Sequence, residues 1–238
     1  FSGAQRTYCM VTVLFVLILI VGIAIPGFWV KHVLQKYSEP VDRYRDRGSG
    51  AELARHLLDR FDLHHVAVEI APTGDHYDPE ARAVRLAGDR YHGHSLTAIT
   101  VAAHEVGHAI QDARSERLFR NRQQLAKLAA RGQQFGSLVM LSAPVVMLVS
   151  RSPGLGLGFL AIAIGSMLLG TLVHLITLPV ELDASFGKAL PILQEGQYLH
   201  DGDLPHANRI LKAAAMTYVA ASLASLLNVG RWLAVLRR

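Results

Sequence analysis

The chain has a single cysteine and few charged residues. Cys9 has no partner for a disulfide bond, and one thiol cannot build a cysteine metal site. Only 18% of the residues are charged, and no basic segment is interleaved with aromatic residues, so nothing indicates a nucleic-acid-binding domain. The net charge of +5 is modest, and basic residues flank long apolar runs. This pattern favours anionic lipid headgroups as the partner of the basic residues. Any metal ion would have to be held by histidine and carboxylate side chains.

Hydrophobic residues make up 51% of the chain and gather in long runs. A run of about 20 apolar residues can cross a bilayer as a helix. Residues 1–30 are predicted to contain the first span, an uncleaved anchor, and the alternative is a cleaved signal peptide. Residues 135–180 are predicted to form a hairpin of two spans, and residues 213–238 a fourth span with a basic tail. The composition therefore predicts a multi-pass membrane protein.

Two polar segments, residues 31–134 and 181–212, separate these runs. Within the first, residues 51–61 have apolar side chains at helical spacing, and residues 64–71 alternate as a strand does. Residues 83–87 could pair with that strand after a turn-rich segment. The pattern predicts a small α+β domain with a short β-hairpin or small sheet that lines a cleft.

The strongest motif in the chain is HEVGH at residues 104–108. Residues four apart project from the same face of a helix, so His104 and His108 can converge on one ion, while Glu105 can reach a water bound there. Ser95 is a suitable N-cap for this helix, and Gly107 leaves its surface open to a close substrate or strand. This is the arrangement of zinc metallopeptidases, and the alternative is a pair of hydrogen-bonded histidines in a buried helix.

A catalytic zinc site normally has three protein ligands, so one more is needed. Glu181 follows the predicted hairpin, which returns the chain to the side of the membrane that carries the motif. We therefore expect Glu181 to be the third ligand and Asp183 to orient a ligand histidine. The alternatives are that Asp183 binds the metal, or that Glu181 is a helix-capping or interface carboxylate.

Two further side chains are candidates for a role near the metal. His174 lies two helical turns before Glu181 within a predicted span, where ionisable groups are often functional. It could contact the site or stabilise an oxyanion, or it could hydrogen-bond a neighbouring helix. Arg209 could clamp a substrate carbonyl, or it could face the headgroups.

Several motifs occur in the order found in one known family. They are residues 50–55 (GAELAR), 75–79 (DHYDP), 102–111 (AAHEVGHAIQ), 178–185 (LPVELDAS) and 213–221 (AAAMTYVAA). With them the chain resembles the YugP-like bacterial membrane zinc metallopeptidases, and it is more distantly similar to the gluzincin membrane proteases of the HtpX and CAAX type. The distant relatives carry E-x-x-x-D after the metal motif, whereas Glu181 and Asp183 are only two residues apart. The resemblance implies one zinc ion, an integral-membrane location and proteolysis.

We therefore expect a mainly α membrane protein with about four transmembrane helices and a zincin-like α+β metallopeptidase domain. Its predicted function is zinc-dependent hydrolysis of membrane-associated or misfolded proteins, with Glu105 as general base. Basic residues near the span ends place this domain in the cytoplasm, on the inner face of the cell membrane. The alternatives are a catalytically silent zinc-containing scaffold that regulates partner membrane proteins, and a zinc sensor or transporter.

Overall fold

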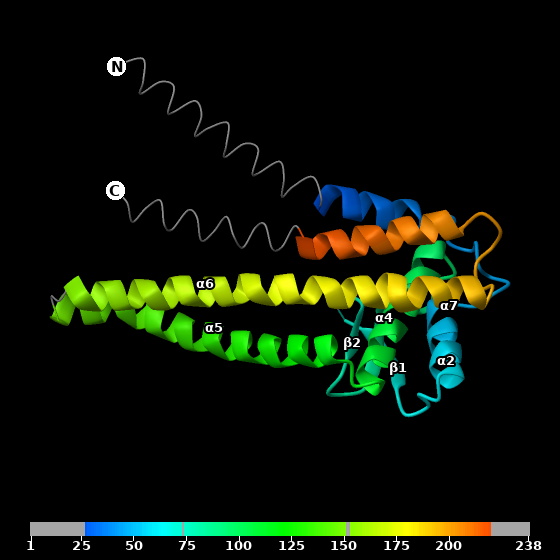
Figure 1. Cartoon of the computed structure of the whole chain (residues 1–238). Helices are drawn as coiled ribbons and strands as arrows, with labels where there is room; N and C mark the ends of the chain where they lie inside the picture. The colour runs from blue at the N-terminus through cyan, green and yellow to red at the C-terminus, as the bar shows by residue number, and fades with distance from the viewer. Residues whose placement is uncertain (1–26, 73, 151–152, 220–238) are drawn as a thin grey trace, which may run out of the picture. The chain divides into compact units, whose positions relative to one another are not determined.

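The computed structural model describes residues 27–72, 74–150 and 153–219 (Figure 1). These residues divide into two compact units. One, here called the mixed unit, consists of residues 28–120 and 177–217 and contains both helices and strands. The other, here called the helical unit, contains residues 121–176 and the few described residues outside the mixed unit.

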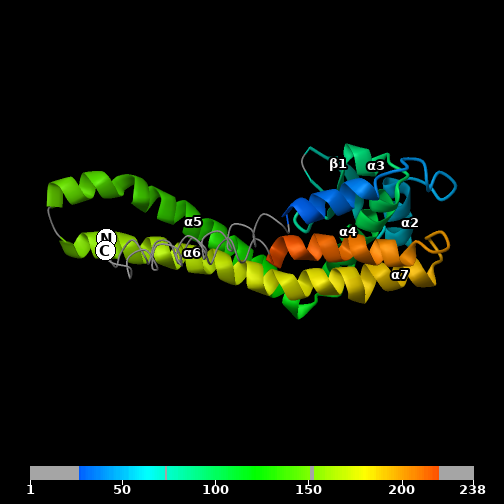
Figure 2. The same ribbon diagram turned by 90° about the horizontal axis from the view of Figure 1, so that it is seen from above.

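The helical unit is built from two long helices. Helix α5 is Arg117–Ser150, of which residues 121–150 belong to this unit, and helix α6 is Pro153–Leu182, of which residues 153–176 belong to it. Figures 1 and 2 both show α5 and α6 running alongside each other. A Cβ atom on Gly132 would lie 3.4 Å from the Leu169 side chain, which is ordinary packing distance for neighbouring helices.

The prediction of four transmembrane helices is wrong. Among the residues that the structure describes, no helix combines the length and the apolar character that a bilayer crossing requires. The runs predicted to form a hairpin lie inside α5 and α6, and α5 begins with a strongly basic half. Most of the predicted first span, and the fourth span beyond residue 219, lie outside the described residues. The cytoplasmic placement was inferred from charges at the ends of these spans, so that inference loses its basis.

A small sheet forms one part of the mixed unit. Its strands are β1 (Ala67–Ala71), β2 (His76–Asp78) and β3 (Ala83–Ala87), in the order β1-β3-β2. β1 and β3 are parallel, with Ala67 opposite Ala83, while β2 is antiparallel to β3. The predicted pairing is right for residues 67–71 and 83–87, whereas residues 64–66 lie outside the strand. The pairing is not a hairpin, because the chain forms β2 on the far side of β3 before it returns.

Helices pack around this sheet and around one central helix. They are α2 (Gly50–Arg60), α3 (Gly88–Tyr91), α4 (Leu96–Ala113), the π-helix η1 (Asp183–Ala189) and α7 (Leu190–Glu195). Further helical turns lie at residues 27–36 and 204–219, of which residues 28–36 and 204–217 belong to this unit. The α2 start has a capping box in which the Ser49 hydroxyl accepts from the Glu52 amide and the Glu52 carboxylate accepts from the Ser49 amide.

Helix α4 is the centre of the mixed unit, since it contacts the helices α2, α3, η1 and α7 and the strands β2 and β3. Figure 2 shows it beside α2 and α7. Its residues 96–111 are buried except Val101, which is half-buried. Apolar side chains of α2, β3, α4 and α7 close the core around it, among them Leu57, Leu86, Ile99 and Leu193. A helix buried on all sides is held rigidly, which suits it to carry a precise arrangement of polar groups.

Candidate metal centre

The metal motif lies in the middle of α4. Ser95 is the N-cap, as predicted, and its hydroxyl accepts a hydrogen bond from the Ala98 amide at 3.2 Å. The helix then continues without interruption through Ala113. His104 and His108 therefore project from the same face one turn apart, with ring centroids 4.7 Å apart.

Glu181 reaches these two histidines from the last turn of α6, inside the mixed unit. Its Oε2 atom lies 3.2 Å from Nε2 of His104 and 3.3 Å from Nε2 of His108. One donor atom from each of the three side chains lies within 4.8 Å of the other two, and all three residues are buried. Within the described part of the chain, no second group of this kind is found.

The three donors suit a zinc ion. Two imidazole nitrogens and one carboxylate oxygen are a typical ligand set for catalytic zinc, and a single divalent ion can be held between atoms at these separations. Burial by itself would raise the pKa of Glu181, but hydrogen bonds from His104 and His108 outweigh it and hold the pKa well below its ordinary value. The carboxylate is thus kept in the charged form that a metal ion requires.

Glu105 is next to His104 on α4 and is also buried. Burial raises the pKa of Glu105 to about 7, although the neighbouring His104 and the backbone amide of Tyr77 act in the opposite direction. Tyr77 belongs to β2, and its hydroxyl donates to Asp112 on α4 at 2.8 Å. Strand β2 is therefore tied to the motif helix close to Glu105, although the sequence predicted a turn-rich segment here and a cleft-lining strand pair at residues 64–71 and 83–87.

Gly107 permits the approach of η1 to α4. A Cβ atom at this position would lie 2.8 Å from the backbone oxygen of Ala184, and a backbone atom cannot move aside as the end of a side chain can. The sequence indicated an open surface for a substrate or a strand, whereas the structure places a helix there. That helix is the segment directly after Glu181, so Gly107 helps to bring the third side chain to the two histidines.

The second nitrogen of each imidazole is also bound within the protein. Nδ1 of His108 lies 2.9 Å from Oε1 of Gln111, and Nδ1 of His104 lies 3.1 Å from the Ser185 hydroxyl. Sequence reasoning missed both partners. Gln111 follows His108 by three residues on the same helix face, a spacing that could have revealed it, whereas Ser185 is placed by η1 and has no local signal.

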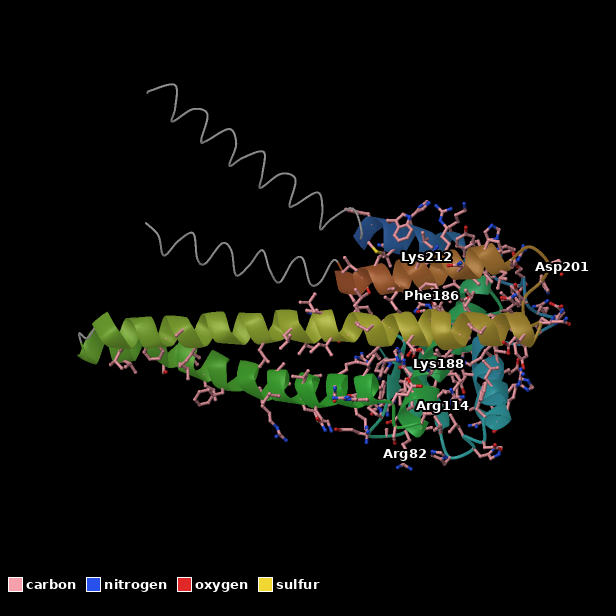
Figure 3. The ribbon with its side chains drawn as sticks, viewed as in Figure 1. Arg82, Arg114, Phe186, Lys188, Asp201 and Lys212 are labelled. Carbon is pink, nitrogen blue, oxygen red and sulfur yellow. The ribbon has the colours of Figure 1, made fainter. Side chains whose placement is uncertain are left out.

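Asp183 was expected to orient a histidine directly, but the structure places it one step further away. Its Oδ2 accepts a hydrogen bond of 2.7 Å from Nε2 of Gln111, and it is paired with Lys188. Burial tends to raise the pKa of Asp183, and the bonds from Lys188 and Gln111 lower it overall. Figure 3 shows Lys188 and Phe186 leaving the ribbon on opposite sides of η1.

The other two candidates do not join this cluster. His174 is on the part of α6 that belongs to the helical unit, and the group formed by the two motif histidines and Glu181 does not include it. Arg209 is exposed on the helical turns at residues 204–217 and is likewise not among the three.

Comparison with known proteins gives two matches over nearly the full chain. Residues 11–237 match the sequence profile of a family described as "Putative neutral zinc metallopeptidase". The chain is also 38% identical over 228 residues to the "Putative membrane protease YugP" of Bacillus subtilis (strain 168). The aligned region covers 93% of this chain and 96% of that protein. No solved structure is similar enough to match.

Proposed function

Because this chain belongs to the family of neutral zinc metallopeptidases, we propose that it is an endopeptidase whose zinc ion is held by His104, His108 and Glu181. The family resemblance drawn from the motifs is confirmed by these matches, and zinc as the cofactor is confirmed with it. The observation that supports this choice of ligands is the convergence of their three donor atoms within 4.8 Å.

When bound, zinc supplies a Lewis acid that activates a water molecule and polarises a peptide carbonyl. Glu105 is proposed to accept the proton of the attacking water on a carboxylate oxygen and to deliver it to the nitrogen of the leaving amine. The rigid, buried α4 keeps Glu105 in a fixed position relative to the ligands.

A catalytically silent scaffold is less well supported, because it has no need of Glu105. Burying a carboxylate that is neither a ligand nor part of an ion pair costs free energy, and a structural zinc site would lose nothing if a neutral residue replaced it. A reacting group explains that cost, since the carboxylate must lie beside the ion in a site from which water is largely excluded.

We also infer that the enzyme works in association with a membrane and cleaves membrane-associated proteins. The related Bacillus protein is named a membrane protease. On α5, Phe135, Leu138 and Leu141 lie on one side of the helix and are 64%, 66% and 79% exposed. Large apolar side chains gathered on one exposed face mark contact with lipid or with another protein. Binding to lipid vesicles should be measured for the wild type and for Leu138→Ser combined with Leu141→Ser, which is expected to bind more weakly.

Zinc content and cleavage together test the proposed chemistry. Glu105→Gln should retain zinc and lose cleavage of a model membrane substrate, because it removes the base and leaves the ligands. His108→Ala and Glu181→Ala should lose both zinc and cleavage. Glu195→Gln changes an exposed carboxylate of the same unit and should behave as the wild type. Full activity in Glu105→Gln would remove the proton-transfer role, and full zinc content in both ligand variants would remove the proposed site.

A further inference from the structure

Gln111 makes hydrogen bonds with three partners, and their chemistry fixes the direction of its amide group. Its Nε2 lies 2.9 Å from the backbone oxygen of Val180 and 2.7 Å from Oδ2 of Asp183. A backbone oxygen can only accept a hydrogen bond, so the NH2 group of Gln111 must face Val180. The amide oxygen then faces Nδ1 of His108, at 2.9 Å.

This direction determines which nitrogen of His108 carries a proton. An amide oxygen can only accept, so Nδ1 of His108 must be an N–H donor. With Nδ1 holding its proton, the nitrogen that is left to bind a metal ion is Nε2, the atom that lies 3.3 Å from Glu181 Oε2. Only a nitrogen with a free lone pair can bind a metal ion.

We propose that Gln111 is a positioning residue that holds His108 in the Nδ1–H tautomer, with Nε2 free to bind zinc. This inference rests on the proposed zinc site. Val180, whose backbone oxygen sets the amide direction, immediately precedes Glu181. The end of α6 therefore supplies the third ligand and also sets the tautomer of the second, so the two ligands are brought into their binding states by one segment.

A chain of charged groups supports the same amide direction. Asp183 accepts from the second N–H of Gln111 and is itself paired with Lys188. Lys188 is buried and also lies 3.0 Å from Oε1 of Glu116, just before α5 begins. Turning the Gln111 amide over would place its oxygen against both a carboxylate and a backbone oxygen. Both contacts would be repulsive, and the contact with the Val180 oxygen is buried, so the reversed amide is excluded.

His104 has a different kind of partner. The Ser185 hydroxyl, 3.1 Å from Nδ1 of His104, can rotate and can either donate or accept. Ser185 can thus satisfy either tautomer of His104, whereas Gln111 permits only one tautomer of His108. Of the two partners, only Gln111 therefore determines which ring nitrogen of its histidine carries the proton.

Zinc affinity and the tautomer of His108 in the zinc-free protein test this role. Gln111→Met has a similar shape and cannot accept a hydrogen bond from nitrogen as an amide oxygen does. We expect it to weaken zinc binding by about 10- to 100-fold, measured by competition with a chelator. Nitrogen NMR of histidine-labelled protein should show that Nδ1 of His108 is no longer fully protonated.

A second variant separates this role from simple bridging between helices. Gln111→Glu keeps an acceptor oxygen for His108 but places a carboxylate against Val180 and Asp183. It should therefore lose thermal stability while its zinc affinity and His108 tautomer stay closer to the wild type than those of Gln111→Met. A purely structural role predicts the reverse order, and that order would overturn the proposal. If Gln111→Met does not fold, the Nε2–H tautomer in Gln111→Glu would also overturn it.

Two controls complete the experiment. Thr97→Val removes another hydrogen bond from a buried α4 side chain to a backbone oxygen, that of Leu34 at 3.0 Å, and should leave zinc affinity unchanged. His108→Ala distinguishes the two proposals. If it keeps wild-type zinc affinity, the proposed metal site is wrong; if it loses zinc while Gln111→Met stays within about twofold of wild type, only the positioning role is wrong.

Discussion

Two buried carboxylates of the mixed unit, Asp203 and Glu181, are each only 2% exposed but have different partners. Asp203 accepts two bonds of 2.7 Å from the guanidinium of Arg43 and one of 2.7 Å from the hydroxyl of Tyr44. Glu181 faces two imidazoles, which carry charge only when protonated. Arginine is permanently charged, so the fold itself neutralises Asp203.

The comparison shows how a fold can use the same buried group for two purposes. A carboxylate with a permanent cation beside it clamps distant segments together, here the loop before α2 and the start of the helical turns at residues 204–217. A carboxylate facing two imidazole nitrogens is arranged for a divalent ion that comes from outside the chain. Changes at the first cluster should therefore affect folding, and changes at the second should affect zinc.

The largest effect on folding is expected from Arg43→Met. It leaves Asp203 buried without its cation, which typically costs about 3–5 kcal/mol for a fully buried pair. Because the Arg43 side chain is 39% exposed, solvent weakens the pair, and we expect a loss of about 2 kcal/mol. Denaturant unfolding of the zinc-free protein measures it. Zinc affinity should not change, and a parallel loss of zinc affinity would break the separation between the two clusters.

Gly107→Ala should affect both folding and zinc. The added methyl group would meet the Ala184 backbone and push η1 from α4, at a cost of about 1–3 kcal/mol. Since η1 follows Glu181 directly, zinc affinity should fall as well. Gly88→Ala is the control, because a Cβ at Gly88 meets nothing within 4 Å and alanine favours a helix. Equal behaviour of the two variants would contradict the close approach.

Acid should act on the Asp203 cluster in a predictable direction. Burial raises the pKa of Asp203, but the bonds from Arg43 and Tyr44 outweigh it and lower the folded pKa below 3.8. Its stabilising contribution is therefore complete above about pH 4 and is lost as the pH falls through the folded pKa. The difference in unfolding free energy between wild type and Asp203→Asn should shrink on acidification. A difference that is constant from pH 6 to pH 2 would contradict the assignment.

The smallest effect is expected from Ser185→Ala. It removes the hydrogen-bond partner of His104 Nδ1 but not a group that enforces one tautomer. We expect a loss of zinc affinity of about 3- to 10-fold, at or below the lower end of the range for such partners. Chelator competition checks it beside Gln111→Met. A larger loss in the serine variant than in the glutamine variant would reverse the ranking of the two histidine partners.

The parts of the site that depend on short-range spacing were accessible from the sequence. His104, Glu105 and His108 share a short motif, and helix geometry alone places the two imidazoles together. Glu181, 73 residues beyond His108, required an argument about where the chain returns. The structure brings Glu181 to the motif, although the two spans at residues 135–180 on which that argument depended are not found among the described residues.

The remaining features depend on tertiary contacts that a single sequence does not encode locally. Ser185 reaches His104 because η1 departs from α-helical geometry, and no composition rule indicates where a π-helix begins. Asp183 was expected to contact a ligand histidine directly. The two-residue spacing from Glu181 could not show that the Gln111 side chain lies between Asp183 and His108. Strand β2, His76–Asp78, is too short for an alternating pattern to be recognised.

The central claim is that one zinc ion is shared by His104, His108 and Glu181. Its most direct test is the zinc stoichiometry of purified wild type and Glu181→Ala, combined with zinc X-ray absorption spectroscopy of the wild type. The account predicts one zinc per chain with two imidazole ligands and oxygen donors, and loss of tightly bound zinc in the variant. A zinc site with unchanged affinity and an unchanged ligand shell in Glu181→Ala would contradict it.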